Sequence, residues 1–394
     1  MNDILLESLK KHYEWKGKIE IVSRVPLKTS EDLSLACTPG VAQPCLEIQK
    51  DIRKSYALTR RSHMVAIITD GTAVLGLGDI GPEAAMPVME GKAVLLKELG
   101  GVDAIPLCIR SKNIDEIVNT VRLLAGSFGA ILLEDISAPR CFEIERRVKA
   151  CCDIPVFHAD QHGTAIVVLA AVLNALRLTK KRKEDVSVVI NGAGAAGIPT
   201  ARLLYEFGIV KLILCDTKGA IYKGRSDLHV EKQNIANITN PMQRKGCLED
   251  MMKGADVFIG LSAPGCVTQT MVESMNTDGI VFALANPVPE IMPDLAIAAG
   301  TAVVGTGRSD FPNQINNVIA FPGVFRGALD VCAADINEQM KIAAAQTIAG
   351  CVTDDRMCLL PNPLDKSVAA CVAEAVAKAA VESGVARYQN ERHT

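Results

Sequence analysis

The clearest structural signal in this chain of 394 residues is the stretch VSVVINGAGAAG at residues 186–197. Val186–Asn191 is a short apolar run, which is typical of a buried parallel strand, and Ala195–Phe207 is a predicted helix. The glycines between them allow a tight turn, close approach of a pyrophosphate to the backbone, and close packing of helix on strand. This order predicts a dinucleotide-binding loop made of Gly192, Ala193, Gly194, Ala195, Ala196 and Gly197.

The next predicted strand, Lys211–Asp216, ends in an acidic residue. Asp216 follows the glycine loop by about 20 residues, the usual spacing for the carboxylate that binds the ribose. It would accept hydrogen bonds from both ribose hydroxyls, which favours NAD. Lys218, two residues later, is able to neutralise a 2′-phosphate, so NADP stays open as the cofactor.

The rest of the chain predicts an α/β protein. After the basic stretch 180–183, further predicted strands at 256–261, 280–285 and 301–304 alternate with helical segments, which favours a Rossmann-type, doubly wound parallel sheet. Before it, the alternation is less regular, with predicted strands at 64–69 and 130–133 and predicted helices at 83–99 and 114–126. We therefore predict an N-terminal α/β substrate domain over residues 1–155 and a dinucleotide domain over 156–394, whose alanine-rich C-terminal helix packs back onto the body.

Composition excludes several classes of function. A formal net charge of −3 gives no general electrostatic reason to bind nucleic acid or an anionic membrane, and no uninterrupted apolar run reaches the length of a membrane helix. The first residues lack the apolar core of a secretory signal. Thirteen cysteines, an odd number without a CxxC pair, predict free and mostly buried thiols in a reducing cytoplasm.

Three acidic residues stand at the ends of apolar runs. Glu134 and Asp135 follow one run, and Asp160 follows another. Carboxylates at loop ends can supply hard oxygen ligands to Mg²⁺ or Mn²⁺. Successive side chains on a strand point to opposite faces, so Glu134 and Asp135 share an ion only if the strand has ended there. The alternative is that these acids cap helices.

Other residues are less specific by pattern alone. The glycine-rich segment 74–81 permits close backbone approach to a ligand or simply serves turns. Lys92 lies in an apolar, predicted helical stretch, where a lysine either extends to solvent or acts as a desolvated base. Asn286 and Asn317 can orient a hydroxy acid or a carboxamide, but asparagine also favours turns for local reasons.

Taken together, these segments resemble one family. The motifs are LACTPGVAQPC (35–45), VLGLGDIGPEAAMPVMEGKA (74–93), LEDI (133–136), FHADQHGTA (157–165), GAGAAG (192–197) and NNVIAFPGVFRGAL (316–329). They resemble the malic enzymes, most closely the small bacterial-type form. The motifs occur in the same order as in that family, and the resemblance extends from about residue 20 to about residue 385.

The resemblance implies a reaction and a set of roles. Malic enzymes oxidatively decarboxylate (S)-malate to pyruvate and CO₂ with NAD⁺ or NADP⁺ and a divalent metal, and a homodimer is expected. By position, Glu134, Asp135 and Asp160 match metal ligands, and Lys92 matches the general base. The remaining matches are Asn286 (malate and cofactor), Asn317 (malate), and the ligand-contacting loop residues Val74, Gly76 and Gly78.

Two residues depart from the family pattern. Cys37 stands where the family usually has the tyrosine that is the proposed acid, and Ala159 replaces the first of two consecutive aspartates. A thiol is acidic enough to donate a proton, but it reaches less far than a phenol. Two alternatives therefore stay open: a related 2-hydroxy-acid dehydrogenase without decarboxylation, and a catalytically impaired paralogue that binds nucleotide and metal.

Overall fold

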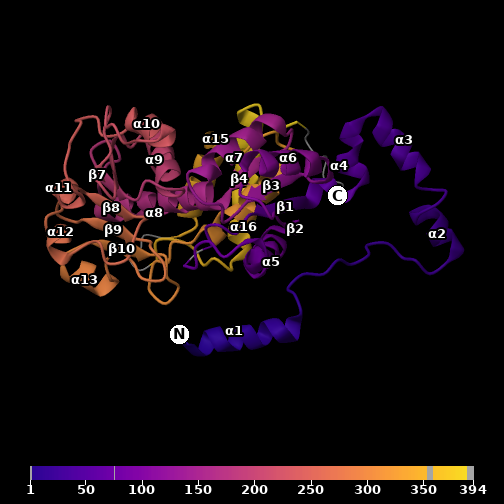
Figure 1. Cartoon of the computed structure of the whole chain (residues 1–394), viewed down its shortest axis with the longest axis horizontal. Helices are drawn as coiled ribbons and strands as arrows, with labels where there is room; N and C mark the ends of the chain where they lie inside the picture. The colour runs from indigo at the N-terminus through magenta and orange to yellow at the C-terminus, as the bar shows by residue number, and fades with distance from the viewer. Residues whose placement is uncertain (1, 75, 353–357, 388–394) are drawn as a thin grey trace.

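The computed structural model describes residues 2–74, 76–352 and 358–387, which form two parallel sheets flanked by helices (Figure 1). The first sheet has the strand order β2-β1-β3-β4, and all its pairs are parallel. Its strands are β1 (Met64–Thr69), β2 (Asp103–Cys108), β3 (Ala130–Leu133) and β4 (Val156–His158). The strands predicted at 64–69 and 130–133 are confirmed.

Helices connect the strands of this first sheet. Helix α5 (Pro82–Gly100) begins with a proline in its first turn and is capped by Gly101, which adopts the left-handed conformation that glycine allows. The following crossovers contain α6 (Ile114–Leu124), η3 (Ala125–Ser127) and α7 (Arg140–Cys151). The helices predicted at 83–99 and 114–126 match α5 and α6 closely.

The second sheet has the order β10-β9-β8-β5-β6-β7. Its strands are β5 (Ser187–Asn191), β6 (Lys211–Asp216), β7 (Gly219–Ala220), β8 (Val257–Gly260), β9 (Ile280–Ala283) and β10 (Val303–Thr306). All pairs are parallel except β6 with the short β7. Because β6 and β8 flank β5 on opposite sides, the predicted doubly wound sheet is confirmed, with a switch point at the end of β5.

Short helices complete this second half of the molecule. They are α9 (Gly197–Glu206), α10 (Val230–Ala236), α11 (Leu248–Met252), α12 (Gln269–Glu273) and α13 (Pro293–Ala298). Helix α9 starts at the last glycine of the predicted dinucleotide loop. The loops that leave β5, β8 and β9 therefore converge on one edge of the sheet, where such folds bind their ligands.

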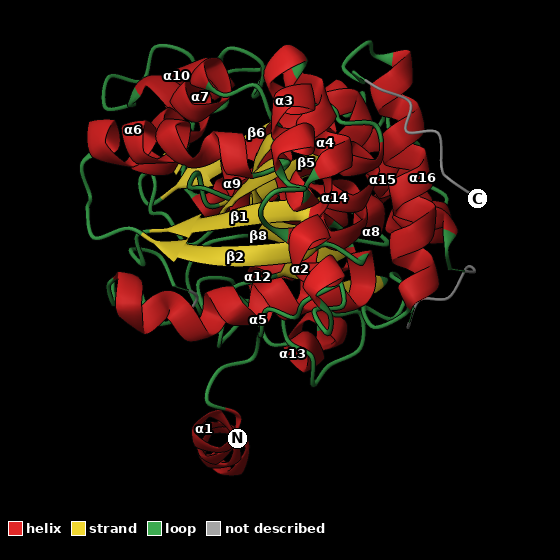
Figure 2. Ribbon diagram, turned by 90° about the vertical axis from the view of Figure 1, so that its right-hand side faces the viewer, coloured by secondary structure: helices red, strands yellow, loops and turns green. Residues whose placement is uncertain are grey.

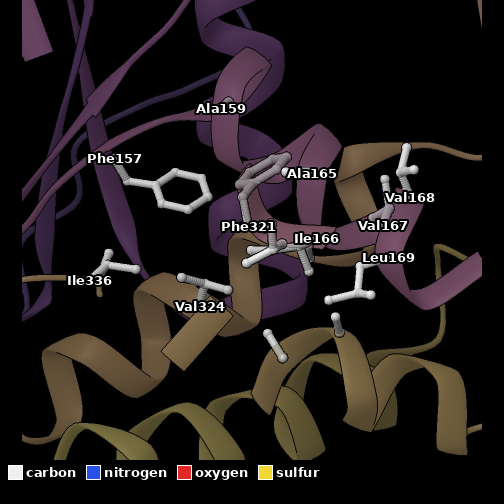
Figure 3. Close-up of a cluster of buried hydrophobic side chains, with 14 of the residues drawn as sticks. Phe157, Ala159, Ala165, Ile166, Val167, Val168, Leu169, Phe321, Val324 and Ile336 are labelled. Atoms are coloured by element: carbon white, nitrogen blue, oxygen red, sulfur yellow. The ribbon is translucent and has the colours of Figure 1, made fainter. Parts of the chain in front are cut away.

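Apolar helices join the two sheets. They are α8 (Thr164–Thr179), α14 (Phe321–Asp330), α15 (Glu338–Gly350) and α16 (Lys366–Glu382). Figure 3 shows the core between them, where Phe157 from β4 and Phe321 and Val324 from α14 surround Ile166 of α8. The stretch Ala159–Thr179 is as long and apolar as a membrane span requires, but 67% of its most apolar window is buried inside the protein. Its composition thus serves core packing.

The first sheet extends past the domain boundary predicted at residue 155. Strand β4 pairs with β3 through Ile131 and Val156, so it is an integral part of the first sheet. One continuous apolar core includes residues of both sheets and of helix α8. The chain crosses between the two halves along α8, after β4 has ended.

The N-terminal residues form an arm that leaves the body (Figures 1 and 2). It comprises α1 (Asn2–Trp15), α2 (Ser30–Ala36) and α3 (Ala42–Lys50). The chain then rejoins the body through η1 (Ile52–Lys54), α4 (Ser55–Leu58) and η2 (Arg60–His63), where Ser55, Arg61 and Ser62 are buried. Neither α2 nor α3 contains a buried residue. Large apolar side chains are exposed along the arm, including Ile21 at 90% and Leu35 at 70%. Lys18 ties the arm to α5 through a backbone hydrogen bond to Glu90 Oε2 of 2.9 Å.

The cysteines are free, as predicted, but most are not buried. Among the described residues, Cys141, Cys215 and Cys332 are buried, whereas seven cysteines are exposed: Cys37, Cys45, Cys151, Cys247, Cys351, Cys358 and Cys371. Cys371 illustrates the error, because it lies on the outer face of the alanine-rich helix α16 although its sequence neighbours are apolar.

Candidate active site

The carboxyl ends of β3 and β4 bring the three predicted acids together. Glu134 and Asp135 directly follow β3, and Asp160 lies just beyond β4 in the π-helical turn η4 (Ala159–Gly163). Because β3 and β4 are parallel neighbours, these ends lie side by side. One carboxylate oxygen from each of the three residues lies within 4.8 Å of the others.

A local backbone feature lets consecutive acids face one site. Asp135 has φ of +54°, a left-handed conformation in which the strand has ended. The alternation of side chains between the two sheet faces therefore no longer applies to Glu134 and Asp135. The Asp135 backbone N–H donates to Asp160 Oδ2 at 3.1 Å, which fixes the two loop ends relative to each other.

The cluster has the properties that a divalent cation requires. Glu134 Oε2 and Asp135 Oδ2 are buried and accept no hydrogen bond from any described residue. Burial raises the pKa of Glu134 to about 8, against the influence of Lys92, and burial together with Asp160 raises the pKa of Asp135 to about 7. Buried carboxylates that repel one another and lack donors fit Mg²⁺ or Mn²⁺, which prefer oxygen ligands.

Lys92 reaches this cluster from helix α5. Its Nζ lies 3.0 Å from Glu134 Oε1, 3.5 Å from Asn317 Oδ1 and 5.0 Å from the ring centroid of Phe321. Burial opposes the charged form of Lys92, but the charges of Glu134 and Asp160 outweigh it and raise its pKa. A divalent cation on the same carboxylates would remove much of that effect and favour the neutral amine.

The two predicted asparagines border the same region. Asn317 begins the short helix η5 (Asn317–Ile319). It packs closely on Gly163 of η4, because a Cβ added to that glycine would lie only 3.1 Å from Asn317 Cβ. Asn286 follows β9 and precedes Pro287, and its amide donates to Leu284 O at 3.4 Å. These contacts place one asparagine beside the lysine and the other at the edge of the dinucleotide half.

The glycine-rich segment forms a tight turn that faces the second sheet. Val74 and Gly78 exchange two backbone hydrogen bonds, of 3.0 and 2.8 Å. Gly76 and Gly78 have φ near +75°, which glycine adopts without strain. A Cβ on Gly76 would lie 3.9 Å from Pro287 Cδ, so this turn meets the Asn286 loop. The Val74 side chain is itself buried, so Val74 builds the turn instead of presenting its side chain to a ligand.

The dinucleotide loop has the geometry that its glycines predict. A Cβ on Gly192 would lie 2.2 Å from Leu261 O, and one on Gly197 would lie 1.7 Å from Gly192 O, so neither position accepts a side chain. Gly194 faces open space, because a Cβ there would meet no atom of the described residues within 4 Å, and it leaves room for a ligand at the start of α9. Ala193 is buried and packs against the core, whereas Ala195 and Ala196 are partly exposed.

Asp216 ends β6 as predicted, but its carboxylate already has several partners. Oδ2 lies 2.6 Å from Arg225 Nη2 and 2.5 Å from Lys232 Nζ, and Oδ1 accepts the Lys218 backbone N–H at 3.0 Å. Burial opposes ionisation of Asp216, but Arg225 and Lys232 lower its pKa. The Lys218 ammonium pairs with Asp227 at 2.9 Å. The position predicted to bind the ribose thus contains one carboxylate close to two cations.

Sequence reasoning missed two buried acids near these loops. Glu290 accepts the backbone N–H groups of Ser262 at 2.8 Å and Ala285 at 3.0 Å, so it ties together the loops after β8 and β9. Asp70, at the end of β1, pairs with Arg140 at 2.8 Å. Their only sequence signal was an acid close to the end of a predicted strand.

The two residues that depart from the family pattern lie in different places. Cys37 is the C-cap of α2 on the arm, exposed, with Thr38 Oγ1 at 3.9 Å from its Sγ. Figure 1 shows α2 far from α5, so Cys37 does not reach Lys92 within one chain. Ala159 is the first residue of η4 and is fully buried.

Comparison with known proteins identifies the relatives of the chain. Residues 16–113 match the malic enzyme N-terminal domain, and residues 161–381 match the malic enzyme NAD binding domain. The bifunctional malic/malolactic enzyme of Bacillus subtilis is 56% identical over 97% of this chain and 94% of that protein. The NAD-dependent malic enzyme of Geobacillus stearothermophilus is 54% identical over 95% of this chain and 79% of that protein. The crystal structure of NAD-dependent malic enzyme from Thermotoga maritima superposes with a TM-score of 0.91 at 44% identity, covering 94% of this chain and 98% of that one.

Proposed function

The chain belongs to the malic enzyme family, and on that basis we propose that it oxidatively decarboxylates (S)-malate to pyruvate and CO₂ while reducing NAD⁺ or NADP⁺. One observation carries the proposal: Lys92 Nζ lies 3.0 Å from Glu134, at the edge of a buried cluster of three carboxylates. Simple hydride transfer needs a base, but it does not need three buried acids beside that base.

The roles of the residues follow from this arrangement. Glu134, Asp135 and Asp160 would hold Mg²⁺ or Mn²⁺, which when bound acidifies the malate hydroxyl and stabilises the enolate left by loss of CO₂. Lys92 in its neutral form takes the hydroxyl proton. Asn317 orients the Lys92 amine through its Oδ1, and Asn286 faces the substrate from the dinucleotide half. The backbone of the 74–81 turn, including Gly76 and Gly78, borders the substrate.

The cofactor lies along the second sheet in this proposal. The loop of Gly192, Gly194 and Gly197 takes the pyrophosphate at the start of α9, and Asp216 accepts the ribose hydroxyls. This carboxylate favours NAD, the cofactor in the name of the Geobacillus stearothermophilus relative. Arg225 and Lys232, at 2.6 and 2.5 Å from Asp216, supply positive charge for a 2′-phosphate, so NADP is the second cofactor we expect to be used.

We further propose that the protein is a homodimer, with the N-terminal arm packed on a second copy. The exposed side chains of Ile21 and Leu35 are apolar surface that a protein normally covers. A cavity of about 890 Å³ between residues 18–24 of the arm and helix α5 offers space for the other chain. Because Cys37 lies far from Lys92 in its own chain, we propose that in such a dimer Cys37 of the partner subunit approaches Lys92 and acts as the final acid.

The cellular setting follows from the cysteines. Free thiols at seven exposed positions persist in a reducing compartment, so we propose a cytoplasmic location. Malate is the substrate in this proposal, and the formal charge of −3 supports no role in binding nucleic acid.

One assay tests the proposed function against its alternatives. NAD(P)H, CO₂ and the organic product are measured together, with malate and Mn²⁺ supplied. Reduced cofactor, CO₂ and pyruvate in equal amounts are expected. Reduced cofactor without CO₂ would instead identify a plain 2-hydroxy-acid dehydrogenase, and cofactor binding without turnover would identify an impaired paralogue. Lactate with CO₂ and no net reduction would indicate the malolactic reaction named for the Bacillus subtilis relative.

A further inference from the structure

A buried polar network holds the turn that carries Asp160. His162 lies in η4, two residues after Asp160. Its Nε2 is 2.7 Å from Glu145 Oε1 of α7, and its Nδ1 is 3.0 Å from Lys341 Nζ of α15. Glu145 and Lys341 are 6% and 2% exposed. One imidazole therefore ties η4 to a helix of the first sheet and to a helix of the C-terminal region.

The network assigns a role to each ring nitrogen. The Lys341 ammonium can only donate, so His162 Nδ1 accepts its hydrogen bond. His162 Nε2–H then donates to the Glu145 carboxylate. Lys341 also donates to Glu338 Oε1 at 2.9 Å, which balances its charge. Both ring nitrogens are thus satisfied by groups that come from separate helices.

Hydrogen bonds, more than close packing, restrain this side of the turn. Phe157 supports one side of the His162 ring, with the ring centroids 5.4 Å apart. On the side toward α9, a cavity of about 220 Å³ borders Gln161, His162, Ile198 and Lys341. Because the wall of η4 is open there, loss of the Glu145 and Lys341 contacts would leave the turn free to shift into the cavity.

We propose that Glu145, His162 and Lys341 are positioning residues that set the affinity of the three-carboxylate cluster for a divalent cation. Asp160 is the least buried of the three acids, with 32% of its side chain exposed, and its place depends on η4. The mutual repulsion of the acids favours displacement of that turn unless it is held. This inference rests on the proposed metal-dependent function, and it concerns residues that do not themselves bind the ion.

The test measures Mn²⁺ binding directly, without malate or cofactor, by electron paramagnetic resonance of free Mn²⁺. His162→Leu removes both hydrogen bonds and is expected to weaken Mn²⁺ binding about 10–100-fold, the usual effect of losing such a supporting contact. His162→Gln should stay within a few-fold of wild type, because a carboxamide can accept from Lys341 and donate to Glu145. Lys341→Met provides a second disruption if His162→Leu fails to fold.

The matched control is Asn174→Leu in α8, the helix that continues from η4. Asn174 is buried and donates to Ala349 O at 3.0 Å and to Leu359 O at 2.8 Å, so its loss lowers stability without touching the network. It should lower Tm but keep wild-type Mn²⁺ affinity. Equal Mn²⁺ affinity in His162→Leu and wild type, or equal losses in His162→Leu and Asn174→Leu, would overturn the inference. A wild-type protein that does not bind Mn²⁺ would refute the metal site of the proposed function, and this inference with it.

Discussion

Lys92 Nζ and Glu134 Oε1 are 3.0 Å apart, which joins the middle of helix α5 to the end of strand β3. Both side chains are largely buried, so neither charge is compensated by bulk water. The same Glu134 carboxylate belongs to the three-acid cluster. The lysine and the candidate metal ligands therefore form one electrostatic unit, in which the ionisation of each depends on the others.

Replacement of Lys92 by alanine should slow malate oxidation by about 10²–10⁴-fold, the usual contribution of a general base. Cofactor binding should persist, because Lys92 belongs to α5 of the first half of the molecule, whereas the glycine loop joins β5 to α9 in the second. Steady-state kcat and a cofactor titration measure the two effects. Lys253→Ala is the control, since Lys253 is an exposed lysine that pairs at the surface with Asp250. A near-normal kcat in Lys92→Ala would exclude this lysine as the base.

The metal-free protein should lose stability as pH rises. The folded-state pKa of Asp135 is raised to about 7, above its ordinary value of 3.8, so its protonated form stabilises the fold at low pH. This contribution is complete below about pH 4 and is lost as pH rises through about 7. It amounts to roughly 4 kcal/mol at most for one group.

Urea denaturation of the metal-free protein at several pH values measures this loss. Asp135→Asn should flatten the dependence on pH, because the amide does not ionise. Asp79→Asn is the control, as Asp79 is exposed and pairs with Lys112. The prediction would be contradicted if the free energy of unfolding of the metal-free wild type fell no more between pH 5 and pH 8 than that of Asp135→Asn.

Asp216→Ser should shift cofactor preference toward NADP. The substitution removes the carboxylate that repels a 2′-phosphate and that pairs with Arg225 and Lys232. Lys232 is then available to bind the phosphate, with Arg225 beside it still paired with Asp227. We expect the ratio of kcat/KM for NADP to that for NAD to rise at least about tenfold, equivalent to about 1.4 kcal/mol. Asp250→Ser, at a partly exposed acid that pairs with Lys253 and accepts the Cys247 backbone N–H, should leave the ratio unchanged. No change in Asp216→Ser would mean that Asp216 does not face the ribose.

Charged substitutions on the arm should dissociate the proposed dimer without unfolding the chain. Ile21 and Val22 are 90% and 67% exposed, so Ile21→Asp with Val22→Asp disturbs no core packing within one chain. Light scattering after size exclusion should report a monomer, and circular dichroism should be unchanged. Val230→Asp, at a 66% exposed residue of α10, is the control and should remain dimeric. A double variant that keeps the wild-type mass would place the interface elsewhere.

The role of Cys37 is tested by restoring the residue that the family usually has. Cys37→Ala should lower pyruvate formation, because the alanine methyl cannot donate a proton. Cys37→Tyr should maintain or raise it, because the phenol donates a proton and reaches further. Cys45→Ala, at another exposed cysteine of the arm, is the control. A loss in Cys37→Ala that tyrosine does not rescue would show that the thiol serves packing.

The local parts of this fold were readable from the chain itself. The run Val186–Asn191 and its three glycines predict a strand, a turn and a helix, because apolar periodicity and glycine conformation act over a few neighbouring residues. The same reasoning found strand β1 and helix α5. It did not predict that β4 belongs to the first sheet. This strand has only three residues, so its pairing with β3 identifies it and its local sequence does not.

What the tertiary structure alone decided is which distant residues meet and how their charges interact. The sequence pointed to Glu134, Asp135 and Asp160 as ligand types, but only the parallel pairing of β3 with β4 brings them within 4.8 Å. The motif around Cys37 matches the family, yet the fold places Cys37 on the N-terminal arm, away from the Lys92 site of the same chain. Residue chemistry is local and can be read in order along the chain, whereas proximity and burial are long-range properties that arise only when the chain folds.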